Sequence, residues 1–173
     1  VKRGIDARVV IPLYSTMAQK MREQCHFAKF FYFSLGWRSC YCGIFTAEAN
    51  GVKYYLIDNE QYFKRGGTYG EYDDGERFAY FSKAVLEILP QIDFFPDIIH
   101  ANDWHTALVP VYLDTQYRSV PGYGEIKTVF SIHNIEFQGK YDRSILESVF
   151  GIYPSQESLL DFDGCLNLMK GAI

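Results

Sequence analysis

Polar side chains able to do chemistry gather at two places in the sequence, and each place follows a predicted strand. The first runs from His100 to His105, and the second runs from Ser131 to Asn134. In an open α/β sheet, ligands bind beyond the carboxyl ends of the strands, where loops and helix N-termini present side chains and backbone N–H groups. The two stretches therefore predict a ligand site at one edge of a sheet.

Several of these residues have a structural role open to them as well as a functional one. Either Asp103 or Asn102 can be the N-cap of the following helix, which leaves the other to point into the crevice. His133 and Asn134 end a strand, so they either reach a ligand or anchor a turn, with Asn134 in a left-handed conformation. Trp104 is either a core wedge or an aromatic platform for a sugar.

A metal centre is another chemical interpretation of the same side chains. The imidazole and carboxylate groups of His100, Asp103, His105 and His133 suit several divalent metals. Their spacing does not reproduce the His-Glu-x-x-His pattern, in which two ligands share one helix face. His100 also follows two isoleucines, a setting typical of a hydrogen-bonded core residue. We therefore predict no metal here and a His100 that is buried in its strand.

The elements that must position these residues alternate between helix and strand. We expect a helix over residues 76–89, a strand over 97–101, a helix from about Asp103 to Pro121–Gly122, and a strand over 126–132. The last strand is apolar enough to be covered on both faces. Pro110 predicts either an early kink or a short first segment of its helix. This order implies parallel pairing, and hence a Rossmann-like α/β fold with helices on both faces of the sheet.

The N-terminal half adds strands and one long connection. We expect a buried strand ending at Pro12, a loop or short helix over residues 15–25, and strands over 26–34, 37–47 and 52–57. Asn50–Gly51 is a favoured turn pair and predicts a β-hairpin insertion. The glycine-rich connection over 58–75 contains Tyr69 and is either a functional loop or an exposed excursion.

Composition narrows the class of partner. The chain has 173 residues, 48% hydrophobic and 22% charged, which fits one globular domain over residues 1–173. A net charge of -4 without a basic cluster argues against nucleic acid and against anionic membranes as partners. The four cysteines lack the dense spacing of a secreted disulfide scaffold, so we expect reduced thiols and a cytoplasmic location.

Both ends of the sequence interrupt a predicted unit. The chain opens on what reads as the end of a helix, and the predicted helix over 163–173 still presents an apolar face where the sequence stops. We therefore expect this sequence to be a piece of a longer protein.

The motif from His100 to Pro110 resembles the His-Ala-x-Asp-Trp-His segment of bacterial glycogen synthases and plant starch synthases. Other segments resemble that family in the same order along nearly the whole chain. They are residues 9–14, 55–59, Tyr69-Gly70, 76–78, 128–134, 137–139 and 167–171.

This resemblance implies a retaining glucosyltransferase of the GT-B type, with two Rossmann-like domains and the active site between them. The family transfers glucose from ADP-glucose to the non-reducing 4-hydroxyl of an α-1,4-glucan, with no cofactor or metal required. By motif match His133 contacts the donor glucose, and Asp103 with Trp104 and His105 lies on the acceptor side. Tyr69 lines the same cleft. The matched segments also place Asn134, Gln138 and Gly139 at the substrate.

The resemblance further implies that parts of the enzyme lie outside this sequence. The first βα unit, with its glycine-rich loop and lysine, and the whole C-terminal domain are missing, so we expect the chain alone to be inactive. Two other interpretations of the sequence stay open. One is a non-catalytic α-glucan-binding module that uses Trp104 and the tyrosine-rich loop, and the other is a metal-dependent hydrolase centred on the three histidines and Asp103.

Overall fold

The computed structural model describes residues 4–173, which form two compact units. The first unit comprises residues 4–33 and 39–74, and the second comprises residues 34–38 and 75–173. Both contain helices and parallel strand pairs, as the predicted α/β class requires. Among residues 4–173, no helix is both long and apolar enough to span a membrane.

A four-stranded sheet in the order β1-β4-β3-β2 dominates the first unit. Its elements are β1 (Arg8–Pro12), α1 (Gln19–Arg22), β2 (His26–Leu35), β3 (Arg38–Ala49), β4 (Val52–Asp58) and α2 (Glu60–Phe63). Strands β3 and β4 pair antiparallel, and their turn has positive φ at both Asn50 and Gly51, so the predicted hairpin is confirmed. β4 also pairs parallel with β1, which makes it part of the main sheet and not only of an insertion.

The connection after β4 is more ordered than its glycine-rich sequence predicts. Tyr62 and Phe63 of α2 are buried, and this short apolar pair gives the helix its anchor. Further along, Arg65 forms an ion pair with Asp73 at 2.7 Å, and the backbone N–H of Gly70 donates to Asp74. The connection predicted over 58–75 therefore begins with a short helix, which the sequence analysis did not predict.

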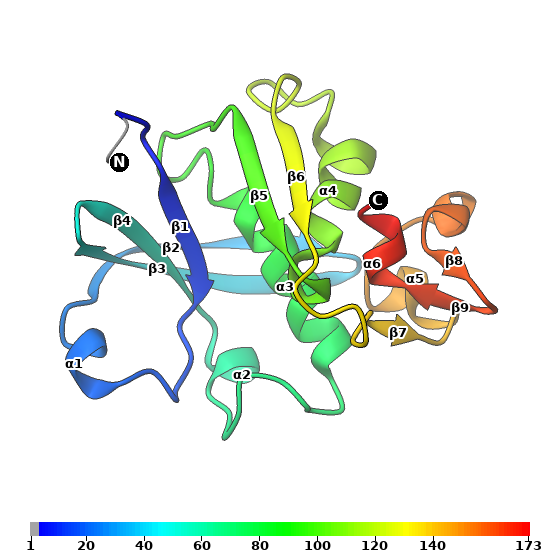
Figure 1. Cartoon of the computed structure of the whole chain (residues 1–173), viewed down its shortest axis with the longest axis horizontal. Helices are drawn as coiled ribbons and strands as arrows, with labels where there is room; N and C mark the ends of the chain where they lie inside the picture. The colour runs from blue at the N-terminus through cyan, green and yellow to red at the C-terminus, as the bar shows by residue number, and fades with distance from the viewer. Residues whose placement is uncertain (1–3) are drawn as a thin grey trace. The chain divides into compact units, whose positions relative to one another are not determined.

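The second unit contains the parallel pair β5 and β6, with helices beside it (Figure 1). Its elements are α3 (Asp74–Glu87), β5 (Ile98–Asn102), η1 (Trp104–Thr106), α4 (Leu108–Tyr112), η2 (Leu113–Tyr117), β6 (Lys127–Ser131), β7 (Lys140–Tyr141), α5 (Ile145–Ser148), η3 (Pro154–Leu159), β8 (Asp161–Phe162), β9 (Cys165–Asn167) and α6 (Leu168–Gly171). The predicted helices and strands around the two polar stretches are thus present, and the parallel pairing is confirmed.

Pro110 explains how the helical segment after β5 is divided. The segment begins with the 3-10 turn η1, and α4 starts at Leu108. Pro110 therefore lies in the first turn of α4, where a backbone N–H has no intrahelical acceptor to lose. Of the two predicted alternatives, a kink or a short first segment, the structure has the short first segment, η1. The helix continues through a π-helical turn, η2.

Two expectations for the second unit were wrong. Strand β6 was predicted to be covered on both faces, yet Val129 is 46% exposed, because among residues 4–173 β6 pairs with β5 in a sheet of two strands. The helix predicted over 163–173 begins only at Leu168. Residues 161–167 instead form the β8–β9 hairpin, whose turn has positive φ at Asp163 and Gly164.

Close backbone contact fixes the position of Gly151 in the second unit. Gly151 has φ of +63°, and a Cβ atom there would lie 2.6 Å from the backbone nitrogen of Gly36. A left-handed conformation costs a non-glycine residue roughly 1–2 kcal/mol. Overpacking typically costs about 1–3 kcal/mol more.

We therefore expect Gly151→Ala to lower the free energy of unfolding of the purified protein by about 2–5 kcal/mol. Denaturant unfolding followed by circular dichroism measures this change. Gly66→Ala is the matched control, because Gly66 has no atom within 4 Å of an added Cβ. Equal unfolding midpoints for the two variants would contradict the prediction.

Candidate functional site

The two polar stretches meet because β5 and β6 run parallel and in register. Asn102, the last residue of β5, pairs with Ser131, the last residue of β6. The backbone N–H of Asp103 then donates to the carbonyl of Ser131 at 2.9 Å and extends the ladder by one bond. Both strands therefore end at the same edge, where the chain between β6 and β7 also passes (Figure 1).

The Asp103 carboxylate holds the chain that leaves β6. Its Oδ1 accepts the backbone N–H of His133 at 2.7 Å and the backbone N–H of Asn134 at 3.2 Å. Neither Asp103 nor Asn102 caps the following helix with its side chain. The Asp103 side chain makes no capping hydrogen bond. The Asn102 side chain instead bonds to the carbonyl of His100 and to the imidazole of His133. Both predicted side-chain N-caps were therefore wrong, and the Asp103 carboxylate instead joins the end of β5 to the end of β6.

Backbone strain accompanies this arrangement. Asp103 has φ of +56°, and it is one of four non-glycine residues with positive φ among those that the structure describes. Asn134, for which a left-handed conformation was one of two alternatives, is not one of them; its side-chain oxygen accepts the backbone N–H of Glu136 at 3.0 Å. The residue of the site with positive φ is therefore the one that carries the carboxylate.

The imidazole of His133 is oriented by Asn102. His133 Nε2 lies 3.0 Å from Asn102 Oδ1, and Asn102 Nδ2 donates to the carbonyl of His100 at 3.3 Å. An amide oxygen can only accept, so Nε2 carries the proton and Nδ1 is the nitrogen left for another partner. His133 is exposed, so its ring is available to a ligand at the edge of the sheet.

His100 is not the buried strand residue that the sequence predicts. It is exposed, and its Nε2 lies 2.7 Å from Ser131 Oγ on the neighbouring strand. The prediction was wrong because two apolar neighbours in the sequence do not cover a side chain on a two-stranded sheet. Sequence reasoning assigned no site role to Ser131. Its contact with His100 depends on the register between β5 and β6, which no local pattern in the sequence shows.

Trp104 is buried next to the site, and His105 beside it is half-buried. Trp104 is 7% exposed, and its ring packs edge-on against Phe78 at 5.1 Å and beside the His105 ring at 4.2 Å. A Cβ atom on Gly139 would lie 2.8 Å from the Trp104 ring, so the chain at Gly139 passes directly over the indole. This burial favours the core-wedge interpretation of Trp104 over the sugar platform.

Gln138 and Gly139 are held by the C-terminal elements. Asn167 Nδ2 donates to Gln138 Oε1 at 2.8 Å, and the backbone N–H groups of Leu168 and Met169 donate to the carbonyls of Gly139 and Gln138. Asn167 is 2% exposed and also accepts the Lys170 N–H at the start of α6. Sequence reasoning did not assign Asn167 to the site. The family resemblance over residues 167–171 was the feature of the sequence that could have pointed to it.

Tyr69 belongs to the first unit. It lies on the irregular segment between α2 and α3 and is 59% exposed. Its predicted contact with substrate stays a prediction.

The metal interpretation lacks a ligand set. No group of three or more His, Cys, Asp or Glu side chains in the described part of the chain could hold a metal ion. His100 and His133 bond instead to Ser131 and Asn102, and Asp103 bonds to backbone N–H groups. The hydrolase hypothesis centred on these side chains is therefore not supported.

Comparison with known proteins identifies the family. The profile of the starch synthase catalytic domain matches residues 1–173. This chain belongs to that family. Glycogen synthase from Clostridium kluyveri is 49% identical over 174 residues, and one from Bacillus cereus is 48% identical over 174 residues. Each match covers 99% of this chain and 37% of the relative, so the chain spans little more than a third of the length of these proteins.

A solved structure agrees with the fold. The catalytic domain of starch synthase IV from Arabidopsis thaliana, bound to ADP and acarbose, superposes with a TM-score of 0.84 at 28% identity. The match covers 99% of this chain and 36% of that one. The predicted α/β fold of the GT-B class is confirmed.

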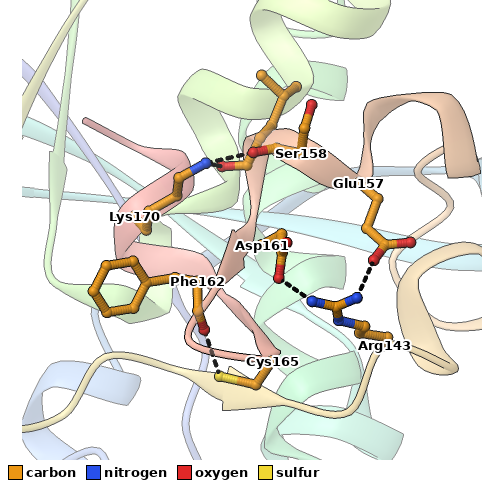
Figure 2. Close-up of polar contacts among 8 residues, drawn as sticks. Arg143, Glu157, Ser158, Asp161, Phe162, Cys165 and Lys170 are labelled. Atoms are coloured by element: carbon orange, nitrogen blue, oxygen red, sulfur yellow. Dashed lines mark hydrogen bonds and ion pairs between the residues drawn. The ribbon is translucent and has the colours of Figure 1, made fainter.

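The C-terminal elements of this chain carry a polar cluster of their own (Figure 2). Arg143 forms ion pairs with Glu157 at 3.3 Å and with Asp161. Lys170 donates to the carbonyls of Ser158 and Leu159. These bonds join η3, β8 and α6, and α6 follows the Asn167 that holds Gln138. The cluster therefore ties together the C-terminal elements that hold Gln138 and Gly139.

We predict that Asp103→Ala speeds hydrogen exchange of the His133 and Asn134 amides at least tenfold. A hydrogen bond to a charged group is worth about 1.5–3 kcal/mol, which corresponds to such a factor. Amide exchange resolved by residue measures it. Asp103→Asn keeps an oxygen acceptor and should have a smaller effect.

Asp93→Ala is the matched control for this experiment, because Asp93 is an exposed aspartate that also has positive φ, at 49°. If both alanine variants change the His133 and Asn134 amides equally, the carboxylate is not what holds the strand end.

Proposed function

We propose that this chain forms most of the N-terminal Rossmann-like domain of a retaining glucosyltransferase of the glycogen and starch synthase type. The full-length protein transfers glucose from ADP-glucose to the non-reducing 4-hydroxyl of an α-1,4-glucan in the cytoplasm. The observation that carries the proposal is the exposed His133 imidazole at the carboxyl edge of a parallel strand pair, in a chain of the starch synthase family. The named relatives are glycogen synthases, and the solved one was bound to ADP and acarbose.

In the proposed reaction, the bond between C1 of glucose and the terminal phosphate oxygen of ADP breaks. A new bond forms between C1 and the acceptor 4-oxygen, whose proton is released to solvent, and ADP leaves with the negative charge. His133 is the group of this chain that contacts the donor sugar. With Nε2 on Asn102, its Nδ1 is turned to a sugar hydroxyl.

Asp103 acts in this scheme as a positioning residue. Its Oδ1 is already used by two backbone N–H groups, so its main contribution is to keep His133 and Asn134 in one place. A preorganised polar group costs no reorganisation when charge develops in the transition state. The second carboxylate oxygen remains for the acceptor side of the cleft, as the resemblance implies.

We predict that His133→Ala and Asp103→Ala each lower the turnover of the full-length enzyme by well over tenfold, as loss of a transition-state hydrogen bond typically does. Steady-state kinetics with ADP-glucose and glycogen measures this. His26→Ala replaces an exposed histidine on β2 and serves as the control. Near-normal turnover in both site variants would mean that these residues are structural.

A double-mutant cycle separates orientation from direct contact. Asn102→Ala should lower turnover by less than His133→Ala, because it removes only the partner of Nε2. The same change should have no further effect in the His133→Ala background. Additive losses in the double variant would show that Asn102 acts independently of His133.

We predict that the 173-residue chain alone shows no glucosyl transfer and binds ADP-glucose far more weakly than the full-length enzyme does. The proposal places the nucleotide phosphates against parts of the protein outside this sequence. Radiolabelled transfer and calorimetric binding measure the two properties. Robust transfer by the purified chain would contradict the two-domain assignment.

A further inference from the structure

Thr106, which has no role in the reaction proposed above, closes the open side of β5 at its last residue. In the part of the chain that the structure describes, β5 pairs with β6 on one side only. Asp103, which follows β5, donates its backbone N–H toward β6, to the carbonyl of Ser131. Successive residues of a strand direct their N–H groups to opposite sides, so the N–H of Asn102 faces away from β6.

One hydroxyl group satisfies the backbone of Asn102 on this side. Thr106 Oγ1 accepts the backbone N–H of Asn102 at 2.6 Å and donates to the carbonyl of the same residue at 2.8 Å. A hydroxyl has one proton to donate and two lone pairs that accept, so a single threonine can form both bonds. Thr106 therefore takes the place that a neighbouring strand would otherwise have, at this one residue.

The same residue holds the strained backbone of Asp103. With φ of +56° and ψ of 176°, Asp103 lies in a region found almost only at glycine. Such strain persists only where the surrounding structure over-determines it. The Asp103 carbonyl accepts the backbone N–H of Thr106 at 3.0 Å and lies 3.2 Å from its hydroxyl oxygen. Thr106 therefore fixes the backbone of both Asn102 and Asp103.

The backbone of Asn102 in turn determines where its side-chain amide lies. Asn102 Oδ1 lies 3.0 Å from His133 Nε2, and this bond orients the imidazole. Asn102 is exposed, so packing does not hold its side chain in place. Its Nδ2 donates to the carbonyl of His100 at 3.3 Å, which is long for a hydrogen bond from nitrogen. The position of the amide therefore depends mainly on the backbone that Thr106 holds.

We propose that Thr106 is a positioning residue for glucosyl transfer. Its hydroxyl fixes the backbone of Asn102, the Asn102 amide orients His133, and Nδ1 of His133 then faces the donor sugar. The contact with the sugar rests on the proposed function, whereas the bonds from Thr106 to Asn102 do not. Because a misplacement of about 1 Å at a reacting group can cost a large factor in rate, a residue that does not touch the sugar still affects turnover.

Steady-state kinetics of the full-length enzyme with ADP-glucose and glycogen tests this role. Thr106→Val keeps the shape of the side chain and removes the hydroxyl, so we expect kcat to fall by about three- to tenfold, the factor that one neutral hydrogen bond is worth. Thr106→Ser retains the hydroxyl and should restore most of the activity. Thr115→Val is the matched control, because Thr115 is also half-buried and its hydroxyl donates to the carbonyl four residues earlier, that of Val111, at 2.7 Å.

A double-mutant cycle with Asn102→Ala shows whether Thr106 acts through the Asn102 amide. The alanine variant keeps the backbone N–H and carbonyl to which Thr106 bonds, and it removes the amide that orients His133. Thr106→Val should therefore lower kcat far less in the Asn102→Ala background than in the unaltered enzyme. A loss of equal size in both backgrounds overturns the proposal, because Thr106 would then act by another route.

A measurement on the histidine ring separates this proposal from the proposed function. NMR relaxation of the full-length protein with ¹³C-labelled histidine reports the order of the His133 ring, whose signal is identified by its loss in His133→Ala. Thr106→Val should lower the order parameter of this ring, and Thr115→Val should not.

An unchanged order parameter in Thr106→Val overturns the positioning role, even if the enzyme transfers glucose as proposed. If the unaltered protein transfers no glucose but the His133 ring loosens in Thr106→Val, the proposed function fails and the positioning role stands. Should Thr106→Val not fold, Thr106→Ala removes the same hydroxyl and decides.

Discussion

The hydrogen bonds from two backbone N–H groups to one oxygen of Asp103 are the interaction on which the site depends. They tie the residue after β5 to the residues after β6, so that two polar stretches 30 positions apart become one surface. Strand register brings the ends of β5 and β6 together. Register alone does not fix the direction of the chain beyond Ser131. The Asp103 carboxylate fixes the direction of this chain through its bonds to the His133 and Asn134 N–H groups. The Asn102 amide then orients the His133 ring.

A second layer makes this geometry rigid. The chain must cross the buried Trp104 ring at Gly139, where any side chain would meet the indole at 2.8 Å. From there Asn167 and the start of α6 hold Gln138 and Gly139 through side-chain and backbone bonds. Trp104 thus contributes to the site as a buried ring against which the chain at Gly139 packs. The family motif therefore contains both a site residue, Asp103, and a buried residue that supports the site.

Sequence reasoning succeeded where a local rule fixes the outcome. The Asn50–Gly51 turn needs positive φ at both residues, and the helix over α3 repeats its apolar residues at helical spacing. It failed where tertiary context decides. Strands β7 and β8 have two residues each, too few for any period to show, and the exposure of His100 depends on how many strands flank β5. The bond from Asp103 to His133 also follows from no pattern in either stretch.

The residue type at position 103 is set by two demands that few side chains meet together. Asp103 has φ of +56° and ψ of 176°, a backbone region found almost only at glycine, and such strain costs about 1–3 kcal/mol. Glycine would relieve the strain but has no acceptor, and asparagine would offer a neutral oxygen, whose hydrogen bonds are roughly half as strong as those to a carboxylate. Two charge-assisted bonds at about 1.5–3 kcal/mol each offset the strain. The carboxylate of Asp103 therefore holds the strand ends strongly enough to offset the strain in its own backbone.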